Sequence, residues 1–379
     1  MPQGTRFAGC SRGQAAGILV LLVAALGWCV WVALTQETIP ARPAATGQGP
    51  EVQGDAEFHG TIVRRVHAGD NYYDAYAAEL RQRGYVPHSM FNWRLPPYAW
   101  LLGKLPSPLW GQCLLILGAL VTLGLGYGVT GRAAGQPAAA AYVVLGSGPF
   151  LWCLFPDLCL FTELWAGLLI ALSVWGYAGG NWRLGLIAGL GALCFRELAL
   201  PYCLLSLAAA CWQRRGREVA WWLAGLTLCG LLLGWHGLEA SRRIPGTEVL
   251  HATAWVQFGG TAFVLLTTQI NFLLILAPAW VAALYLPPAF LGLASWRGPL
   301  AVRAGLTAGV FVAAFCVIGV KPHNAYWGLM YAPLLPIGLV RAPAAVRDLC
   351  NAAFRPRVQD GPARTRPADA PCLEKAGVG

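Results

Sequence analysis

The chain has 379 residues, of which 57% are hydrophobic and only 12% are charged. Soluble proteins carry about 25% charged residues. The apolar residues also gather in blocks long enough to cross the hydrocarbon core of a bilayer, which takes about 20 residues as a helix. This composition excludes an ordinary soluble protein and predicts an all-α integral membrane protein folded as one helical bundle.

In chain order, the apolar blocks predict about ten transmembrane helices. The first block, 17–34, follows Arg6 and Arg12 and is long for a signal peptide, so we interpret it as a retained anchor. A long polar segment, 35–107, separates it from the other blocks. The remaining predicted spans are 109–129, 138–155, 161–177, 184–195, 198–212, 220–235, 262–286, 300–320 and 326–340.

The distribution of Arg and Lys predicts the orientation, because these residues are enriched in short cytoplasmic loops. With the N-terminus in the cytoplasm, the outer connections hold mainly Arg242, Arg243 and Lys321. The inner connections and the segment after the last span hold Arg132, Arg183, Arg214, Arg215, Arg217, Arg297, Arg303, Arg341, Arg347, Arg355 and Arg357. The net charge of +10 follows from this asymmetry and gives no reason to expect nucleic-acid binding.

These patterns predict three parts. Residues 1–16 form a cytoplasmic N-terminus, and 17–350 form the membrane domain, in which 35–107 is an extracytoplasmic loop. Residues 351–379 are expected to be a disordered cytoplasmic tail, because the end of the chain is charged, contains Pro and shows no periodicity. The 12 Cys lie mostly in predicted spans and form no C-x-x-C pair, which indicates packing residues and not a zinc site.

The first loop holds the leading candidate for chemistry. Asp70 follows Gly69 at the head of a predicted helix, where a carboxylate can accept a hydrogen bond from a free backbone N–H group. A capping carboxylate at the membrane interface can also face a substrate, so both roles stay open. Asp74, one helical turn further on, is the second candidate. The apolar spacing over 58–66 predicts an amphipathic helix in the interface just before them.

Further ionisable residues lie on the same predicted side. Asp157 and Glu163 stand at a span boundary, and either is a candidate catalytic carboxylate. The alternative is a structural role for both, one as an N-cap and the other as a charge that stabilises the start of the following helix. Arg196-Glu197 interrupts an apolar run, and charges at such depth mark function by default; a self-neutralising pair is the alternative. The residues expected to bind substrate are Arg94, Arg196, Glu197, His236, His323 and Tyr326.

Carboxylates, arginine and aromatic residues on one face indicate a reaction at the membrane surface. A carboxylate can take a proton from an acceptor hydroxyl, while an arginine stabilises the negative charge on a departing phosphate. Arginine suits that role because its planar fork matches phosphate oxygens. A lipid-linked phosphate would present its sugar at this height.

Four motifs follow one another along the chain: Gly69-Asp70-Asn71-Tyr72-Tyr73, Arg94-Leu95-Pro96-Pro97, Phe195-Arg196-Glu197 and Tyr326-Trp327-Gly328. With the N-terminal span and the long first loop, their order resembles that of the polytopic GT-C glycosyltransferases of bacteria, over roughly residues 15–350. The resemblance implies an inner-membrane enzyme of GT-C-like fold, with catalysis on the extracytoplasmic face. The donor would be a polyprenyl-phosphate-linked sugar, and the acceptor an envelope glycan, lipid or protein.

The resemblance also implies residue roles. Asp70 would act as general base or help to hold a divalent metal (Mg²⁺ or Mn²⁺), the second acid would be Asp157 or Glu163, and Arg196 would bind the phosphate. The first motif departs from the family pattern because Asn71 stands where a paired acid is common. The chain also shows no soluble C-terminal domain of the kind that longer members have.

Two other functions compete with this reading. A carrier or flippase for a lipid-linked saccharide would share the many spans and the Arg196-Glu197 pair, and a non-catalytic subunit of an envelope complex would share the spans alone. Transporters tend to show internal repeats and broken helices near the middle of the bilayer. The sequence shows no convincing repeat, and its charges lie toward the outer ends of the spans, so the transferase is favoured.

The orientation can be tested with an epitope tag inserted at Gln53. We expect antibody or membrane-impermeant reagent to reach the tag from the extracytoplasmic side, and a tag at Arg215 to be reached only from the cytoplasm. A tag at Gln53 that reacts only from the cytoplasmic side would overturn the predicted topology.

Overall fold

The computed structural model describes residues 4–35, 50–83, 93–243, 258–318 and 322–354. Every element in these ranges is a helix, which confirms the all-α prediction for the described part of the chain. The α-helices are α1 (Arg12–Thr35), α2 (Pro50–His67), α3 (Tyr72–Gln82), α4 (Pro96–Lys104), α5 (Pro108–Ala134), α6 (Gln136–Phe150), α7 (Thr162–Ala178), α8 (Trp182–Phe195), α9 (Leu200–Trp212), α10 (Gly216–Ser241), α11 (Gly260–Thr268), α12 (Ala279–Ser295), α13 (Pro299–Phe315), α14 (Leu335–Leu339) and α15 (Ala342–Phe354). Short 3-10 helices are η1 (Arg6–Gly9), η3 (Leu151–Leu154), η4 (Pro156–Leu160), η5 (Glu197–Ala199), η7 (Pro322–Met330) and η8 (Ala332–Leu334).

Several helices are suited to a lipid bilayer. Within the described ranges, four are long and apolar enough to cross a membrane: α1, α5, α6 together with η3, and α10. The bent pair Asn324–Leu339 and Ala342–Phe354, with an angle of 49°, raises this number to five if it is one span. Large apolar side chains such as Val20, Leu117 and Leu228 stand exposed on the long helices, as lipid-facing residues do. Five shorter apolar helices complete the bundle, so helix length alone does not establish the expected count of about ten spans.

Two expected segment boundaries are wrong. The predicted span 262–286 is divided into α11 and α12, and residues between them are not helical. In that interval Asn271 accepts a bond from the backbone of Leu273 at 3.0 Å, and Gln269 donates to the carbonyl of Ala277 at 3.1 Å, so polar side chains satisfy a turn where the apolar pattern suggested helix. At the C-terminal end α15 continues to Phe354, beyond the predicted boundary at 351. The rest of the expected tail, 355–379, lies outside the described residues.

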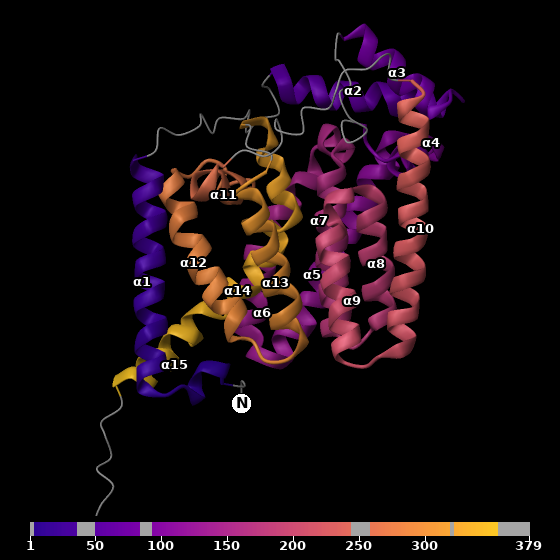
Figure 1. The fold of residues 1–379 in the computed structure, drawn as a ribbon. Helices are drawn as coiled ribbons and strands as arrows, with labels where there is room; N and C mark the ends of the chain where they lie inside the picture. The colour runs from indigo at the N-terminus through magenta and orange to yellow at the C-terminus, as the bar shows by residue number, and fades with distance from the viewer. Residues whose placement is uncertain (1–3, 36–49, 84–92, 244–257, 319–321, 355–379) are drawn as a thin grey trace, which may run out of the picture.

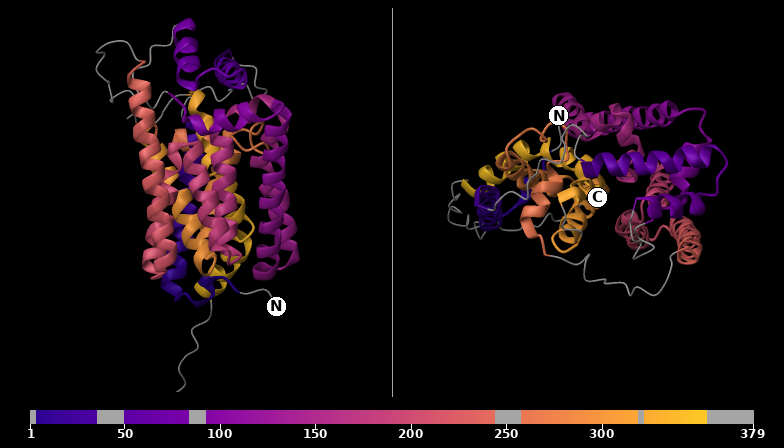
Figure 2. Two further views of the ribbon diagram at one scale, coloured as in Figure 1. Left: turned by 90° about the vertical axis from the view of Figure 1, so that its right-hand side faces the viewer. Right: turned by 90° about the horizontal axis from the view of Figure 1, so that it is seen from above.

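The helices form an upright bundle with a layer across each end (Figure 1). The layer formed by α2, α3 and α4, here called the end layer, covers one end, and α2 lies across the bundle when seen from above (Figure 2). Phe58, Ile62 and Val63 are buried on the inner face of α2, which confirms that this helix is amphipathic. At the opposite end α15 lies beside η1 (Figure 1), where the hydroxyl of Thr5 donates to Asp348 at 2.7 Å.

Helices α12 and α14 pack through glycine. A β-carbon added to Gly292 would lie 1.8 Å from the carbonyl oxygen of Gly338, and one added to Gly338 would lie 1.9 Å from the carbonyl oxygen of Ala289. Small residues let helix backbones approach this closely, and close packing is a main source of helix association in lipid. The yellow and orange helices of Figure 1 are therefore joined by backbone contacts.

Gly292→Ala should destabilise the protein, because the added methyl group meets a carbonyl oxygen and not a flexible side chain. Overpacking of this kind costs about 1–3 kcal/mol of unfolding free energy. Gly309→Ala on α13 is the matched control, since a β-carbon there meets nothing within 4 Å. Thermal unfolding in detergent measures both variants, and equal melting temperatures would contradict the proposed contact.

Candidate functional site

Four charged side chains meet where the end layer joins the bundle, and we call Arg94, Glu163, Arg196 and Glu197 the charge cluster. Oε1 of Glu163 lies 2.8 Å from Nε of Arg196 and 3.3 Å from Nη2 of Arg94. Nη1 of Arg196 also lies 2.5 Å from Oε1 of Glu197. One carboxylate thus binds two arginines that are far apart in the sequence, and a second carboxylate binds the inner arginine.

The local fold explains where these charges sit. Glu163 lies in the first turn of α7, and Arg196 is the C-cap residue that follows α8. A negative charge at a helix start and a positive charge at a helix end both interact favourably with the helix dipole. Glu197 begins η5 immediately after α8, and Arg94 lies just before α4.

Burial makes the ion pairs of the charge cluster costly to break. The side chain of Glu163 is fully buried and that of Arg196 is 3% exposed, whereas those of Arg94 and Glu197 are 13% and 16% exposed. A buried charge that loses its partner costs about 3–5 kcal/mol. Two positive and two negative groups balance one another here, and Glu197 is the more accessible carboxylate.

Three tyrosines fix Arg94. Its guanidinium donates to the hydroxyl of Tyr326 at 3.3 Å, and its backbone N–H donates to the hydroxyl of Tyr76 at 3.3 Å. The hydroxyl of Tyr72 donates to the Arg94 carbonyl at 2.5 Å. Burial lowers the pKa of Arg94, but the charges of Glu163, Tyr326, Tyr76 and Glu197 together outweigh it, so that the pKa lies well above its ordinary value. This arginine is positively charged and held in one orientation.

Behind Arg94 lies a histidine that the sequence did not single out. The Nδ1 atom of His59, on the buried face of α2, lies 2.9 Å from the hydroxyl of Tyr98. Burial lowers the pKa of His59 well below its ordinary value, and the positive charges of Arg94 and Arg196 lower it further. His59 is therefore neutral at pH 7 and adds no third positive charge. Its position three residues before Ile62, a spacing that puts both side chains on one face of a helix, was the only available signal.

Asp70 does not cap α3, which was one of the two roles left open for it. Asn71 is the N-cap of α3: its side-chain oxygen accepts from the backbone N–H groups of Tyr73 at 2.9 Å and Asp74 at 3.4 Å. Asp70 is half-exposed and binds Nε of Arg65 at 2.7 Å. Asn caps a helix as well as Asp does, so the sequence alone could not show which of the adjacent residues Asp70 and Asn71 caps α3.

The other predicted site residues have different partners or surroundings where the structure describes their side chains. Asp74 is exposed and binds Nε of Arg243 at 2.7 Å, and Asp157 is exposed in η4. His236 is buried with its Nδ1 atom 3.1 Å from the hydroxyl of Tyr73. His323 belongs to η7, but its side chain lies outside the described part of the structure. Of the residues that the sequence selected, the structure brings together Arg94, Glu163, Arg196, Glu197 and Tyr326.

The surroundings of Asp70 do not fit the divalent metal that the resemblance implies. The carboxylate is held by an arginine, whose charge opposes a cation there. Mg²⁺ is bound through one or two carboxylates with oxygen ligands around it. Within the described ranges no group of three or more His, Cys, Asp or Glu side chains is placed to hold an ion. We derive no step through a metal.

Comparison of the chain with protein-family models, with curated proteins and with solved structures gives no match. A functional assignment therefore rests on the residues and the geometry of this chain.

Asn71→Ala should lower the unfolding free energy by about 1 kcal/mol, the usual cost of losing a side-chain helix cap. Asp70→Ala should change it by less than about 0.5 kcal/mol, because it removes only a partly exposed ion pair. Denaturation of both variants in detergent measures the difference. A larger loss from Asp70→Ala would restore Asp70 as the cap.

Proposed function

We propose that the chain is a membrane glycosyltransferase of GT-C type, which moves a sugar from a polyprenyl-phosphate donor to an envelope glycan, lipid or protein. The observation that carries the proposal is the pair of arginines, Arg94 partly buried and Arg196 buried, that share Glu163 beside the partly accessible Glu197. Arginine forks bind phosphate oxygens, and the cluster lies where a lipid phosphate would reach. The resemblance of the sequence motifs supports the same reaction.

The proposal includes a topology of ten passes. The five shorter apolar helices have 10–17 residues and run within the same bundle as the longer helices. A 17-residue helix rises about 25 Å, close to the ~30 Å hydrocarbon core. The end layer would lie on the extracytoplasmic face of a bacterial inner membrane, and α15 with η1 would lie in the cytoplasm. This orientation puts Arg132, Arg183 and Arg217 on the inner side, as the positive-inside rule requires.

In the proposed reaction the bond between the sugar C1 and the phosphate oxygen breaks, and the acceptor oxygen bonds to C1. Arg94 and Arg196 stabilise the phosphate, which leaves with the electron pair. Glu197 takes the proton of the acceptor hydroxyl, because it is more exposed than Glu163 and is held by one arginine, not two. Glu163 keeps both guanidinium groups in place. Glu197 thus replaces Asp70, whose carboxylate is held by Arg65, as the proposed base.

A carrier for a lipid-linked saccharide is the second candidate, since two arginines beside two carboxylates also suit an anionic cargo. Carrier sites lie near the middle of the bilayer, between broken helices. The charge cluster instead gathers at the start of α7, just after the end of α8 and at the start of η5. This position favours chemistry at the membrane surface.

Two variants separate these functions. Arg196→Met with Glu197→Gln should weaken the binding of polyprenyl phosphate about ten- to hundredfold, because a charge-assisted contact is lost. Glu197→Gln alone should keep the affinity and lower sugar transfer by about 10²–10⁴. Binding is measured on purified protein by titration, and transfer by the incorporation of label from polyprenyl-phosphate sugars into envelope membranes.

The matched control is Arg303→Met with Glu218→Gln, which removes another buried ion pair, 3.4 Å apart, between α13 and α10. It should leave both readouts unchanged. Unchanged binding in the Arg196 and Glu197 double variant would show that the charge cluster only stabilises the fold and does not bind the donor. Normal transport of labelled lipid without any transfer would favour the carrier.

A further inference from the structure

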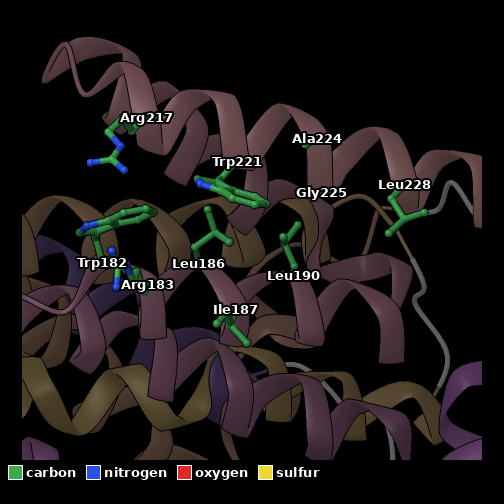
Figure 3. Close-up of a pocket in the computed structure, with 10 residues that line it drawn as sticks. All are labelled: Trp182, Arg183, Leu186, Ile187, Leu190, Arg217, Trp221, Ala224, Gly225 and Leu228. Atoms are coloured by element: carbon green, nitrogen blue, oxygen red, sulfur yellow. The ribbon is translucent and has the colours of Figure 1, made fainter.

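A second site with a different chemistry lies at the other end of the bundle. A groove with a volume of about 580 Å³ runs between α8 and α10, on the outer surface of the bundle. Figure 3 shows Arg183 and Arg217 at one end of the groove and Leu228 at the other, with the rings of Trp182 and Trp221 beside the arginines. The walls beyond the tryptophans are formed by apolar side chains.

Small residues line the middle of the groove on α10. Ala224 and Gly225 lie between the larger Trp221 and Leu228, and all four line the hollow. A β-carbon on Gly225 would lie 2.2 Å from Leu190, so the missing side chain lets α8 approach α10 closely at this point. Trp221 and Leu228 are 61% and 68% exposed, and the groove therefore opens toward the lipid.

The two arginines leave positive charge at one end of this apolar groove. Arg183 and Arg217 lie in the first turns of α8 and α10, and both are exposed. Neither forms an ion pair with a carboxylate in the described ranges; the Arg183 guanidinium lies 5.8 Å from the centre of the Trp182 ring. The nearby Glu218 points inward, is 2% exposed, and is bound by Arg303 and Arg215. The helix starts add further partial positive charge.

The length of the groove matches one leaflet. The eleven residue steps from Arg217 to Leu228 rise about 16 Å along α10. That is about half of the ~30 Å hydrocarbon core. Tryptophan at the level of the arginines suits the interface between headgroups and acyl chains, where its ring is enriched. Along the groove, the arginines, the tryptophans and the apolar walls therefore match the phosphate, the interfacial region and the acyl chain of a phospholipid, in that order.

We propose that this groove binds one anionic phospholipid of the adjoining leaflet. One acyl chain lies along Ala224 and Gly225, and the phosphate lies between Arg183 and Arg217. The site stands apart from the charge cluster at the end layer and does not depend on the function proposed there.

The test titrates delipidated protein in detergent with phosphatidylglycerol or with phosphatidylcholine, and native mass spectrometry reports the first lipid bound. Phosphatidylglycerol should bind at least tenfold more tightly. Arg183→Gln with Arg217→Gln should lower its affinity at least tenfold, and Arg132→Gln, an exposed arginine at the end of α5, should leave it unchanged.

Filling the groove tests the acyl chain independently of the charges. Ala224→Trp should weaken both lipids about tenfold or more, whereas Leu223→Trp, at an exposed neighbour outside the groove, should not. Equal binding of the two lipids by the wild-type chain would overturn the proposal, and so would equal effects of a groove variant and its control. Displacement of phosphatidylglycerol by millimolar inorganic phosphate would also overturn it, because the site would then bind a free anion.

Discussion

The shared carboxylate of Glu163 is the constraint on which the arrangement of this end of the molecule depends. Its oxygen contacts an arginine from the segment before α4 and another from the end of α8. An uncompensated charge at this depth is costly. The end layer and the bundle must therefore pack in the one relative position that lets both arginines reach Glu163. The tyrosines on α3 then hold Arg94 from the outer side. A chain built mainly on non-directional apolar packing thereby gains a directional contact where the end layer joins the bundle.

The helical class of this protein was predictable because composition decides it. A chain with so few charges can satisfy its backbone in lipid only within helices or a closed barrel, and the apolar blocks were too long for barrel strands. The amphipathic α2 was also predictable from its spacing. The break between α11 and α12 was not, because the polar residues that stabilise it, Gln269 and Asn271, are few among apolar neighbours.

The sequence predicted individual residues of the candidate site but not the contacts that bring them together. Arg196 and Glu197 were found because a charged pair inside an apolar run is conspicuous, and Arg94 because it begins the motif Arg94-Leu95-Pro96-Pro97. What the sequence did not reveal is that Glu163 connects them, since contacts between distant helices follow from packing and leave no local pattern. Asp70 misled for the opposite reason: its local pattern is strong, but Asn71 beside it has the same capping chemistry, and Arg65 one turn earlier takes the carboxylate.

The order of the chain gives the charge cluster a consequence for biosynthesis. Arg94 is synthesised well before Glu163, and Glu163 before Arg196. Until α7 is in place, Arg94 has no carboxylate to bind within the cluster and keeps its water. Glu163 arrives with α7 and pairs with Arg94. Arg196 and Glu197 arrive after α8, where Arg196 pairs with both Glu163 and Glu197. We therefore expect closure of the end layer on the bundle to follow the insertion of the hairpin formed by α7 and α8, and a nascent chain that stops before this hairpin to leave the layer open.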